Sequence, residues 1–116
     1  MHELQVTKRI LDIALRHADG HRVSRIAVIH LRIGVLSDLE DEWLQRYFDY
    51  LSRGTLAEKA RLAIERMPIV VRCSGCSRSF EVEKALLDAL ACPGCGESRC
   101  QLVSGREYVV ANMEVV

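Results

Sequence analysis

The chain has 116 residues, of which 49% are hydrophobic, so it is long enough for one small domain with one modest core. Its 16 Lys and Arg residues balance its 16 Asp and Glu residues, and it has no run of like charge, which disfavours a basic nucleic-acid surface or an acidic tail. No apolar stretch approaches the ~20 residues that cross a bilayer, and the start lacks the pattern of a secretory signal, so we expect a cytoplasmic protein with no membrane partner.

The first part of the chain predicts a helix and then a strand. Apolar residues recur near a period of 3.6 over residues 4–18, and Gly20 can end this helix. These apolar positions are Val6, Ile10, Ile13 or Ala14, and Ala18. Residues 25–33 alternate between two faces, as a half-buried strand does. We expect its apolar face to hold Ala27, Ile29, Leu31 and Ile33, and its wetter face to hold Val28, His30 and Arg32.

A second helix is predicted after a break at residues 34–38. Its apolar and aromatic side chains recur at helical spacing, so we expect all of them to lie in the core. They are Trp43, Leu44, Tyr47, Phe48 and Leu51. Residues 60–66 and 107–116 predict two further strands, with a boundary at Pro68. Because the apolar alternation returns at residues 107–116, we expect this last strand to complete the sheet begun earlier.

Four of the five cysteines form two CxxC pairs, Cys73 with Cys76 and Cys92 with Cys95, separated by residues 77–91. This spacing is typical of a four-thiolate zinc site. Four thiolates fill the tetrahedron around Zn²⁺ and leave no open position, so the ion would be structural. Unligated cysteines or two disulfides are weaker alternatives because of this spacing and the expected reducing compartment. A thioredoxin-like redox pair is also a weaker alternative, because that motif is a single CxxC near a βαβ pattern. Cys100 lies outside both pairs, and we assign it no role.

These elements predict an α+β fold: a small three-stranded sheet with two helices, plus an inserted zinc-ribbon subdomain. The predicted domains are an α/β domain of residues 1–69 and 106–116 and a zinc-ribbon domain of residues 70–105. The sequence has no Ser/His/Asp arrangement and no phosphate-cradling glycine loop, so we expect no enzyme. The function should therefore lie in the zinc segment, at the amino terminus, or in both.

The amino terminus is the second candidate site. The chain starts Met1-His2-Glu3, which places an amine, backbone amides and an imidazole within one short chelate. Such a set of nitrogen donors could bind a metal ion. The alternative reading, which the opening residues alone favour, is a solvated histidine at a frayed chain end.

Several short motifs follow one another along nearly the whole chain. They are Met1-His2-Glu3, Ile33-Gly34-Val35-Leu36-Ser37 with Glu40 after it, Arg53-Gly54-Thr55-Leu56-Ala57-Glu58, and the two CxxC pairs. In this order they resemble the HypA/HybF family of hydrogenase-maturation nickel chaperones. Each motif except the cysteines is weak alone, but the combination is specific.

The resemblance implies a metallochaperone that passes Ni²⁺ to the large-subunit precursor of nickel-iron hydrogenase and works with a nickel-handling GTPase. It implies that His2 ligates nickel, that Glu3 is adjacent, and that the carboxylate of Glu40 can add to the site. The α/β domain would then be the nickel-binding domain, with nickel as cargo and zinc as a structural ion. Glu40 also has a purely structural interpretation, because an acidic residue in the first turn of a helix is stabilising.

The competing function is a zinc-ribbon module that binds nucleic acid or a protein partner. Residues 72–99 balance basic and acidic side chains, which gives no stripe that could follow phosphates. The basic residues are Arg72, Arg78, Lys84 and Arg99, and the acidic ones are Glu81, Glu83, Asp88 and Glu97. A protein-binding adaptor stays compatible with the chaperone hypothesis, because metal delivery requires docking.

Overall fold

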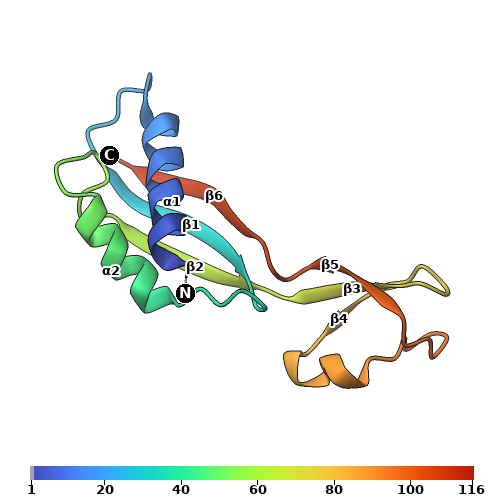
Figure 1. Cartoon of the computed structure of the whole chain (residues 1–116). Coiled ribbons are helices and arrows are strands. Elements are labelled where there is room, and N and C mark those ends of the chain that lie inside the picture. Colours follow the sequence, from blue (N-terminus) through green and yellow to red (C-terminus); the bar gives the residue numbers. More distant parts are fainter. Residues whose placement is uncertain (1) are drawn as a thin grey trace. The chain divides into compact units, whose positions relative to one another are not determined.

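The computed structural model describes residues 2–116 and confirms the α+β fold (Figure 1). The elements in chain order are α1 (Glu3–Ala18), β1 (Ile26–Gly34), α2 (Asp41–Leu51), β2 (Arg61–Met67), β3 (Ile69–Cys73), β4 (Ser79–Val82), the 3₁₀ helix η1 (Lys84–Ala89), β5 (Cys100–Ser104) and β6 (Tyr108–Val115). The strands form two three-stranded sheets, ordered β2-β1-β6 and β4-β3-β5. In the described residues, no helix is long and apolar enough to span a membrane.

The residues divide into two compact units. The first, which we call the helical unit, holds the chain up to Arg32 together with Asp38–Glu65 and Val109–Val116. The second, the ribbon unit, holds Ile33–Ser37 and Arg66–Tyr108. The four cysteines of the two CxxC pairs therefore belong to the ribbon unit, and the amino-terminal segment belongs to the helical unit.

The helical unit is built around side chains that are completely removed from water. α1 and α2 pack against each other, and both helices and β1 contribute buried side chains to this unit. Those with no exposed surface include Ile10, Ala14, Ile26, Ile29, Leu44 and Phe48. The predicted alternation of β1 is confirmed, because Ile29 and Leu31 are buried while Arg32 is exposed. β6 pairs with β1, so the prediction that the last strand completes this sheet is also confirmed.

Two core predictions for the helices are wrong in part. In the first turns of α1, Thr7 is fully buried, whereas the neighbouring Val6, which was predicted to lie in the core, is half-buried. The Thr7 hydroxyl donates to the carbonyl of Glu3, so its burial leaves no unmet hydrogen bond. In α2 the Trp43 side chain is 43% exposed. Leu44 and Phe48 occupy the core as an i, i+4 pair, and Trp43 is rotated about 100° away from Leu44 around the helix axis.

The ribbon unit has a second sheet that the sequence did not predict. β3 is central, with Val71 opposite Phe80 of β4 and opposite Leu102 of β5, both antiparallel. Two glycines from distant parts of the chain meet beside this sheet. A side chain on Gly34 would bring its Cβ within 2.0 Å of the Gly105 carbonyl oxygen, so only glycine fits at position 34. The Leu36 N–H also donates to the Gly105 carbonyl at 2.7 Å.

Candidate metal centres

The cysteine centre is built from two matching turns. The Ser77 N–H donates to the Cys73 carbonyl at 3.0 Å, and the Gly96 N–H donates to the Cys92 carbonyl at 2.9 Å. Each turn closes with a residue in the left-handed region, since φ is +64° at Ser77 and +77° at Gly96. The turns therefore have the same design, and each presents two thiols on a short loop.

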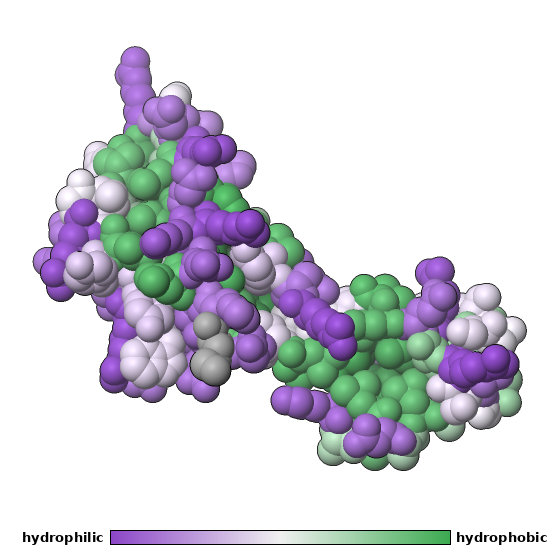
Figure 2. All heavy atoms as spheres, viewed as in Figure 1, coloured by the Kyte–Doolittle hydropathy of each residue, from purple (hydrophilic) through white to green (hydrophobic). Residues whose placement is uncertain are grey.

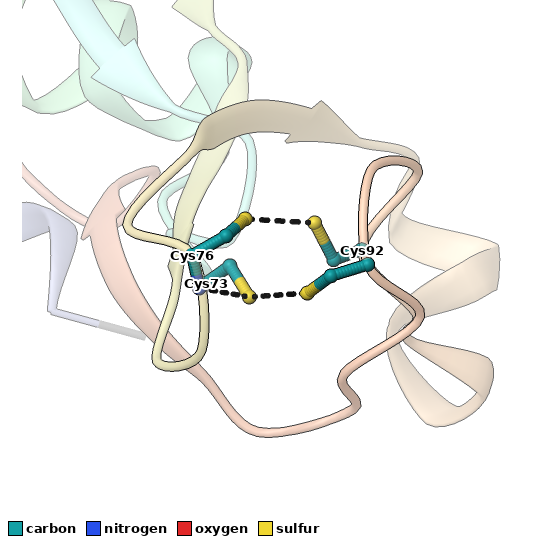
Figure 3. A group of neighbouring side chains, drawn as sticks. Cys73, Cys76 and Cys92 are labelled. Atoms are coloured by element: carbon teal, nitrogen blue, oxygen red, sulfur yellow. Dashed lines mark hydrogen bonds between the residues drawn. The ribbon is translucent and has the colours of Figure 1, made fainter.

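The two turns bring their four sulfur atoms together (Figure 3). The Sγ atoms of Cys73 and Cys95 are 3.5 Å apart, as are those of Cys76 and Cys92. All four ligand atoms lie within 4.8 Å of one another. A tetrahedron with metal–sulfur bonds of about 2.3 Å has sulfur–sulfur edges of about 3.8 Å, so the arrangement fits one tetrahedral metal ion.

Backbone N–H groups point at the first cysteine of each turn. The Gly75 and Cys76 N–H groups donate to the Cys73 sulfur at 3.2 Å and 3.4 Å, and the Gly94 N–H donates to the Cys92 sulfur at 3.4 Å. Such donors favour the thiolate form. The N–H of Cys76 is the main reason that the pKa of Cys73 is lowered, and the N–H of Cys95 is the main reason that the pKa of Cys92 is lowered to about 6.

The pKa of Cys95 is shifted in the opposite direction. The backbone N–H of Glu97 favours its thiolate, but the neighbouring Cys73 sulfur, burial and the other two sulfurs of the cluster outweigh this, and the pKa of Cys95 is raised to about 12. A cluster of four thiols cannot hold four negative charges without a cation among them. The cluster therefore suits a dication, which would replace the proton on Cys95 and offset part of the negative charge of the thiolates.

Cys100 lies next to this cluster but is not part of it. It stands opposite Cys73 across the β3–β5 ladder and is half-buried. Burial, followed by the nearby sulfurs, raises the pKa of its thiol. The group of side chains that could share one metal ion contains the other four cysteines and leaves Cys100 out.

The amino-terminal candidate residues lie in the first turn of α1. The His2 side chain is exposed and makes no capping hydrogen bond, while its carbonyl accepts the Val6 N–H at 3.1 Å. Glu3 is 7% exposed, and its Oε2 accepts the Glu40 N–H at 3.1 Å. Burial acts to raise the pKa of Glu3, but hydrogen bonds from the backbone N–H groups of Glu3 and Glu40 contribute to an overall lowering, so the carboxylate form is favoured.

Glu40 lies beside Glu3 at the start of α2. It is the N-cap residue of α2 in an extended conformation, and its own side chain is exposed. A pocket of about 450 Å³ is lined by Glu3, Asp38, Glu40, Trp43 and Tyr47. The structure thus brings Glu3 and Glu40 together, but within residues 2–116 it does not gather His2 with them into a group of ligand atoms of one ion.

Three residues that line this pocket were not among the candidate site residues predicted from the sequence, namely Asp38, Trp43 and Tyr47. Trp43 and Tyr47 were assigned to the core because of their helical spacing. Asp38 is not part of any recognisable sequence motif. The signal that could have found Trp43 and Tyr47 is their spacing of three and seven residues from Glu40, which places them on the same side of α2. Asp38 precedes α2 and lies two residues before Glu40.

Comparisons with known proteins agree along the whole chain. A family model described as "Hydrogenase/urease nickel incorporation, metallochaperone, hypA" matches residues 1–115. Two similar relatives are named hydrogenase maturation factor HypA: that of Geotalea daltonii is 39% identical with 100% of both chains covered, and that of Geobacter sulfurreducens is 38% identical with 99% of both covered.

Solved structures agree on the fold. The solution structure of the nickel metallochaperone HypA from Helicobacter pylori is 22% identical to this chain, with a TM-score of 0.71 over 100% of this chain and 98% of that one. A second solution structure of a HypA protein, also 22% identical, has a TM-score of 0.77 over 100% of this chain and 97% of that one. At this identity the likeness establishes the shared fold.

Proposed function

The chain belongs to the HypA family of metallochaperones for nickel incorporation and hydrogenase maturation, and from this premise we propose that it binds Ni²⁺ at its amino terminus and delivers it to a nickel-iron hydrogenase. His2 is the central ligand in this proposal, with Glu3 adjacent and Glu40 as an additional carboxylate. The observation that carries the proposal is that the His2 side chain is exposed and serves no capping role in the fold.

The donor chemistry of this segment suits the cargo. Ni²⁺ prefers tetragonal or square-planar fields of nitrogen and oxygen, which an imidazole, backbone amides and carboxylates supply. The exposed position of His2 supports release as well as binding, because a cargo ion must leave the protein to be delivered. A buried site with a complete ligand shell would hold the ion too long for this purpose.

Glu3 has a second task in the proposed site. Its carboxylate receives the N–H of Glu40, and this bond links the start of α1 to the start of α2. We infer that Glu3 orients the amino-terminal segment toward Glu40 in addition to contributing its charge. The pocket beside Glu3 and Glu40 gives an incoming ion or a docked partner access to this place.

The second ion in the proposal is Zn²⁺, held by Cys73, Cys76, Cys92 and Cys95. The support is the tetrahedral fit of the four sulfur atoms and the backbone N–H groups that favour thiolates. Zinc bound in this way would be structural, because four thiolates leave no position for water. We therefore assign nickel binding to residues 1–69 and 106–116 and zinc binding to residues 70–105.

The proposed partners are a nickel-handling GTPase of hydrogenase maturation and the hydrogenase large-subunit precursor. In this proposal the protein acts in the cytoplasm, catalyses no reaction itself, and binds neither nucleic acid nor membranes. The even charge of residues 72–99 supports the exclusion of nucleic acid.

Nickel titration of a His2→Ala variant tests the proposal. We expect the variant to lose stoichiometric nickel binding while its zinc content and circular dichroism stay unchanged, because the His2 side chain makes no capping bond in the fold. His17→Ala is the matched control, since His17 is an exposed histidine at the other end of the same helix. Wild-type nickel affinity in His2→Ala would overturn the proposal.

A tag placed before Met1 provides a second test of the proposed nickel site. It removes the free amine from the segment and leaves every side chain in place, so nickel binding should weaken or change its absorption spectrum. Absence of any nickel site that depends on His2 would favour the competing function, a ribbon module that binds other macromolecules.

A further inference from the structure

The ribbon unit has an apolar groove that the proposed nickel chemistry does not use. The groove has a volume of about 360 Å³ and is lined on its apolar side by residues that include Phe80, Val82, Leu86, Leu90 and Pro93. η1, rich in alanine and leucine, borders it and has no buried residue, and Leu86 is 53% exposed. Figure 2 shows a broad hydrophobic area on the surface of this unit.

The groove runs along a strand edge. In residues 2–116, β4 pairs with β3 and with no other strand, so its second edge is open. Phe80, Glu81 and Val82 of β4 line the groove together with the next residue, Glu83, although neighbouring side chains of a strand point to opposite faces. Residues of both faces can border one groove only if the groove lies against the edge of the strand.

The ladder register fixes which backbone groups point into this edge. Arg72 lies opposite Ser79, so Cys73 lies opposite Arg78, and the Cys73 N–H donates to the Arg78 carbonyl at 2.8 Å. Hydrogen-bonded pairs alternate along an antiparallel ladder. The backbone of Phe80 therefore bonds to β3, and the N–H and C=O of Glu81 face the open edge.

The charged side chains that line the groove are both negative. Glu81 and Glu83 are its two charged lining residues, and both are exposed. Lys84, the next residue, does not line this groove, but it lines a neighbouring pocket together with Pro68, Ile69 and residues 81–83. An occupant of matching chemistry would place apolar side chains in the groove and positive charges beside the two carboxylates.

We propose that this groove binds an extended segment of a partner protein, in which apolar residues alternate with Lys or Arg, and that the segment adds to the ribbon sheet as a strand beside β4. Main-chain hydrogen bonds to the edge supply affinity in this mode, and pockets for alternate side chains supply specificity. The proposal goes beyond nickel binding and does not depend on it.

A second copy of this chain fits the edge less well. Pairing of β4 with β4 of another copy would place acidic side chains of the two edges close together, because Glu81 and Glu83 follow each other on the same short stretch. Like charges directly opposite each other destabilise a strand pair. A basic partner segment has no such repulsion.

Titration of the zinc-loaded full chain with short blocked peptides, followed by NMR, tests this proposal. The probe alternates lysine with valine, and its control alternates glutamate with valine. We expect the lysine peptide to bind with a dissociation constant below about 1 mM, to shift resonances of residues 80–93, and to bind at least about tenfold more tightly than the glutamate peptide. Equal binding of the two peptides, or shifts confined to other residues, would overturn the charge argument.

Variants separate charge from strand addition. The double variant Glu81→Lys with Glu83→Lys should reverse the preference to the glutamate peptide, and Glu65→Lys, an exposed carboxylate of the helical unit, should leave it unchanged. A lysine peptide with N-methylated backbone should bind at least about tenfold more weakly, and the unmodified peptide should slow hydrogen exchange of the Glu81 amide. Unchanged exchange at Glu81, or self-association of the chain that involves residues 80–93 and excludes the peptide, would contradict the proposal.

Discussion

The two units of the chain are stabilised in different ways. The helical unit has six large apolar side chains that are at most 1% exposed, namely Ile10, Ile26, Ile29, Leu31, Leu44 and Phe48. In the ribbon unit the buried apolar side chains of the second sheet are fewer, chiefly Ile69 and Val71, and η1 buries none. Two of its buried residues are themselves cysteines of the cluster, Cys73 and Cys92.

This difference shows where each unit obtains its stability. A packed apolar core stabilises a fold through the surface that it removes from water, at roughly 25 cal/mol per Å². A small unit with little core needs another source, and a structural metal is a common one. The helical unit can therefore place its proposed metal ligand on the surface, where binding and release would leave the core unchanged. Loss of the proposed zinc ion, by contrast, would remove what holds the ribbon unit together.

Loss of the cysteine centre is the largest expected effect. Cys73→Ser should unfold the ribbon unit and abolish zinc binding, because the binding of structural Zn²⁺ contributes about 10–16 kcal/mol to the folding of small zinc-finger peptides. The helical unit should keep its helical circular dichroism. Cys100→Ser is the matched control, since this thiol lies opposite Cys73 but outside the cluster.

Zinc analysis and NMR of both variants measure the outcome. Near-native ribbon resonances together with retained zinc in Cys73→Ser would contradict the four-thiolate assignment. Equal unfolding of the helical unit would instead show that the two units do not differ as described.

Truncation of the helical core is the next largest effect. Phe48→Ala should lower the free energy of unfolding of the helical unit by about 3–5 kcal/mol, because it leaves a cavity at a position with 0% exposure. Trp43→Ala should cost less than about 1 kcal/mol, since the indole is 43% exposed and its ring contacts the Arg46 guanidinium at 5.2 Å from the ring centre. Urea denaturation followed by helical circular dichroism compares them, and similar losses would show that Trp43 belongs to the core.

Much of the helical unit followed from its sequence because its pattern is strong. β1 alternates over its length, and α1 and α2 repeat their apolar residues at helical spacing. Periodicity does not tell which of two adjacent apolar residues turns inward, so Trp43 was assigned to the core with Leu44. Nor does periodicity identify a buried polar residue such as Thr7, whose hydroxyl donates a hydrogen bond to the Glu3 carbonyl in the same helix.

In the ribbon unit, the sequence predicted the site but not the strands. The cysteine spacing predicted which four residues meet, and the structure brings these four together. Its strands were not predicted, because segments of four or five residues that end in turns carry too little alternation. The bond between Glu3 and Glu40 joins residues 37 positions apart, and no local pattern could have predicted it.

Because Gly34 and Gly105 lie very close together, a methyl group added at position 34 should destabilise the fold. Gly34→Ala places a Cβ 2.0 Å from the Gly105 carbonyl oxygen, so the backbone must move, at a cost of about 1–3 kcal/mol. Gly20→Ala is the control, because no atom lies within 4 Å of its Cβ position and only its φ of +81° opposes the change, at about 1 kcal/mol. Thermal unfolding of the zinc-loaded proteins measures both, and a cost at Gly34 no greater than at Gly20 would contradict the close approach.

The pH dependence of the metal-free ribbon unit is the smallest expected effect. Zinc removal should leave a minor folded population, and the pKa of Cys92, about 6 in the folded ribbon against an ordinary value of 9.0, governs how it responds to pH. A lowered pKa means that the fold favours the thiolate, so this contribution is complete above pH 9 and is lost as the pH falls from about 9 to about 6. The raised pKa of Cys95, about 12, works in the opposite sense, because its thiol stabilises the fold below pH 9 and this gain is lost as the pH rises toward 12.

The folded ribbon population of the chelator-treated protein should accordingly stay minor but be largest near pH 9, as measured by the dispersed amide resonances of β3 and β5. Cys92→Ser should reduce the decline between pH 9 and pH 6, to which the lowered pKa of Cys73 also contributes, and should keep the decline above pH 9. The helical unit provides the internal reference, because its core contains no cysteine and its resonances should stay constant over the range in which the ribbon changes. A ribbon population that rises steadily as the pH falls toward 6 would contradict the thiolate-favouring role of the N–H groups around Cys92.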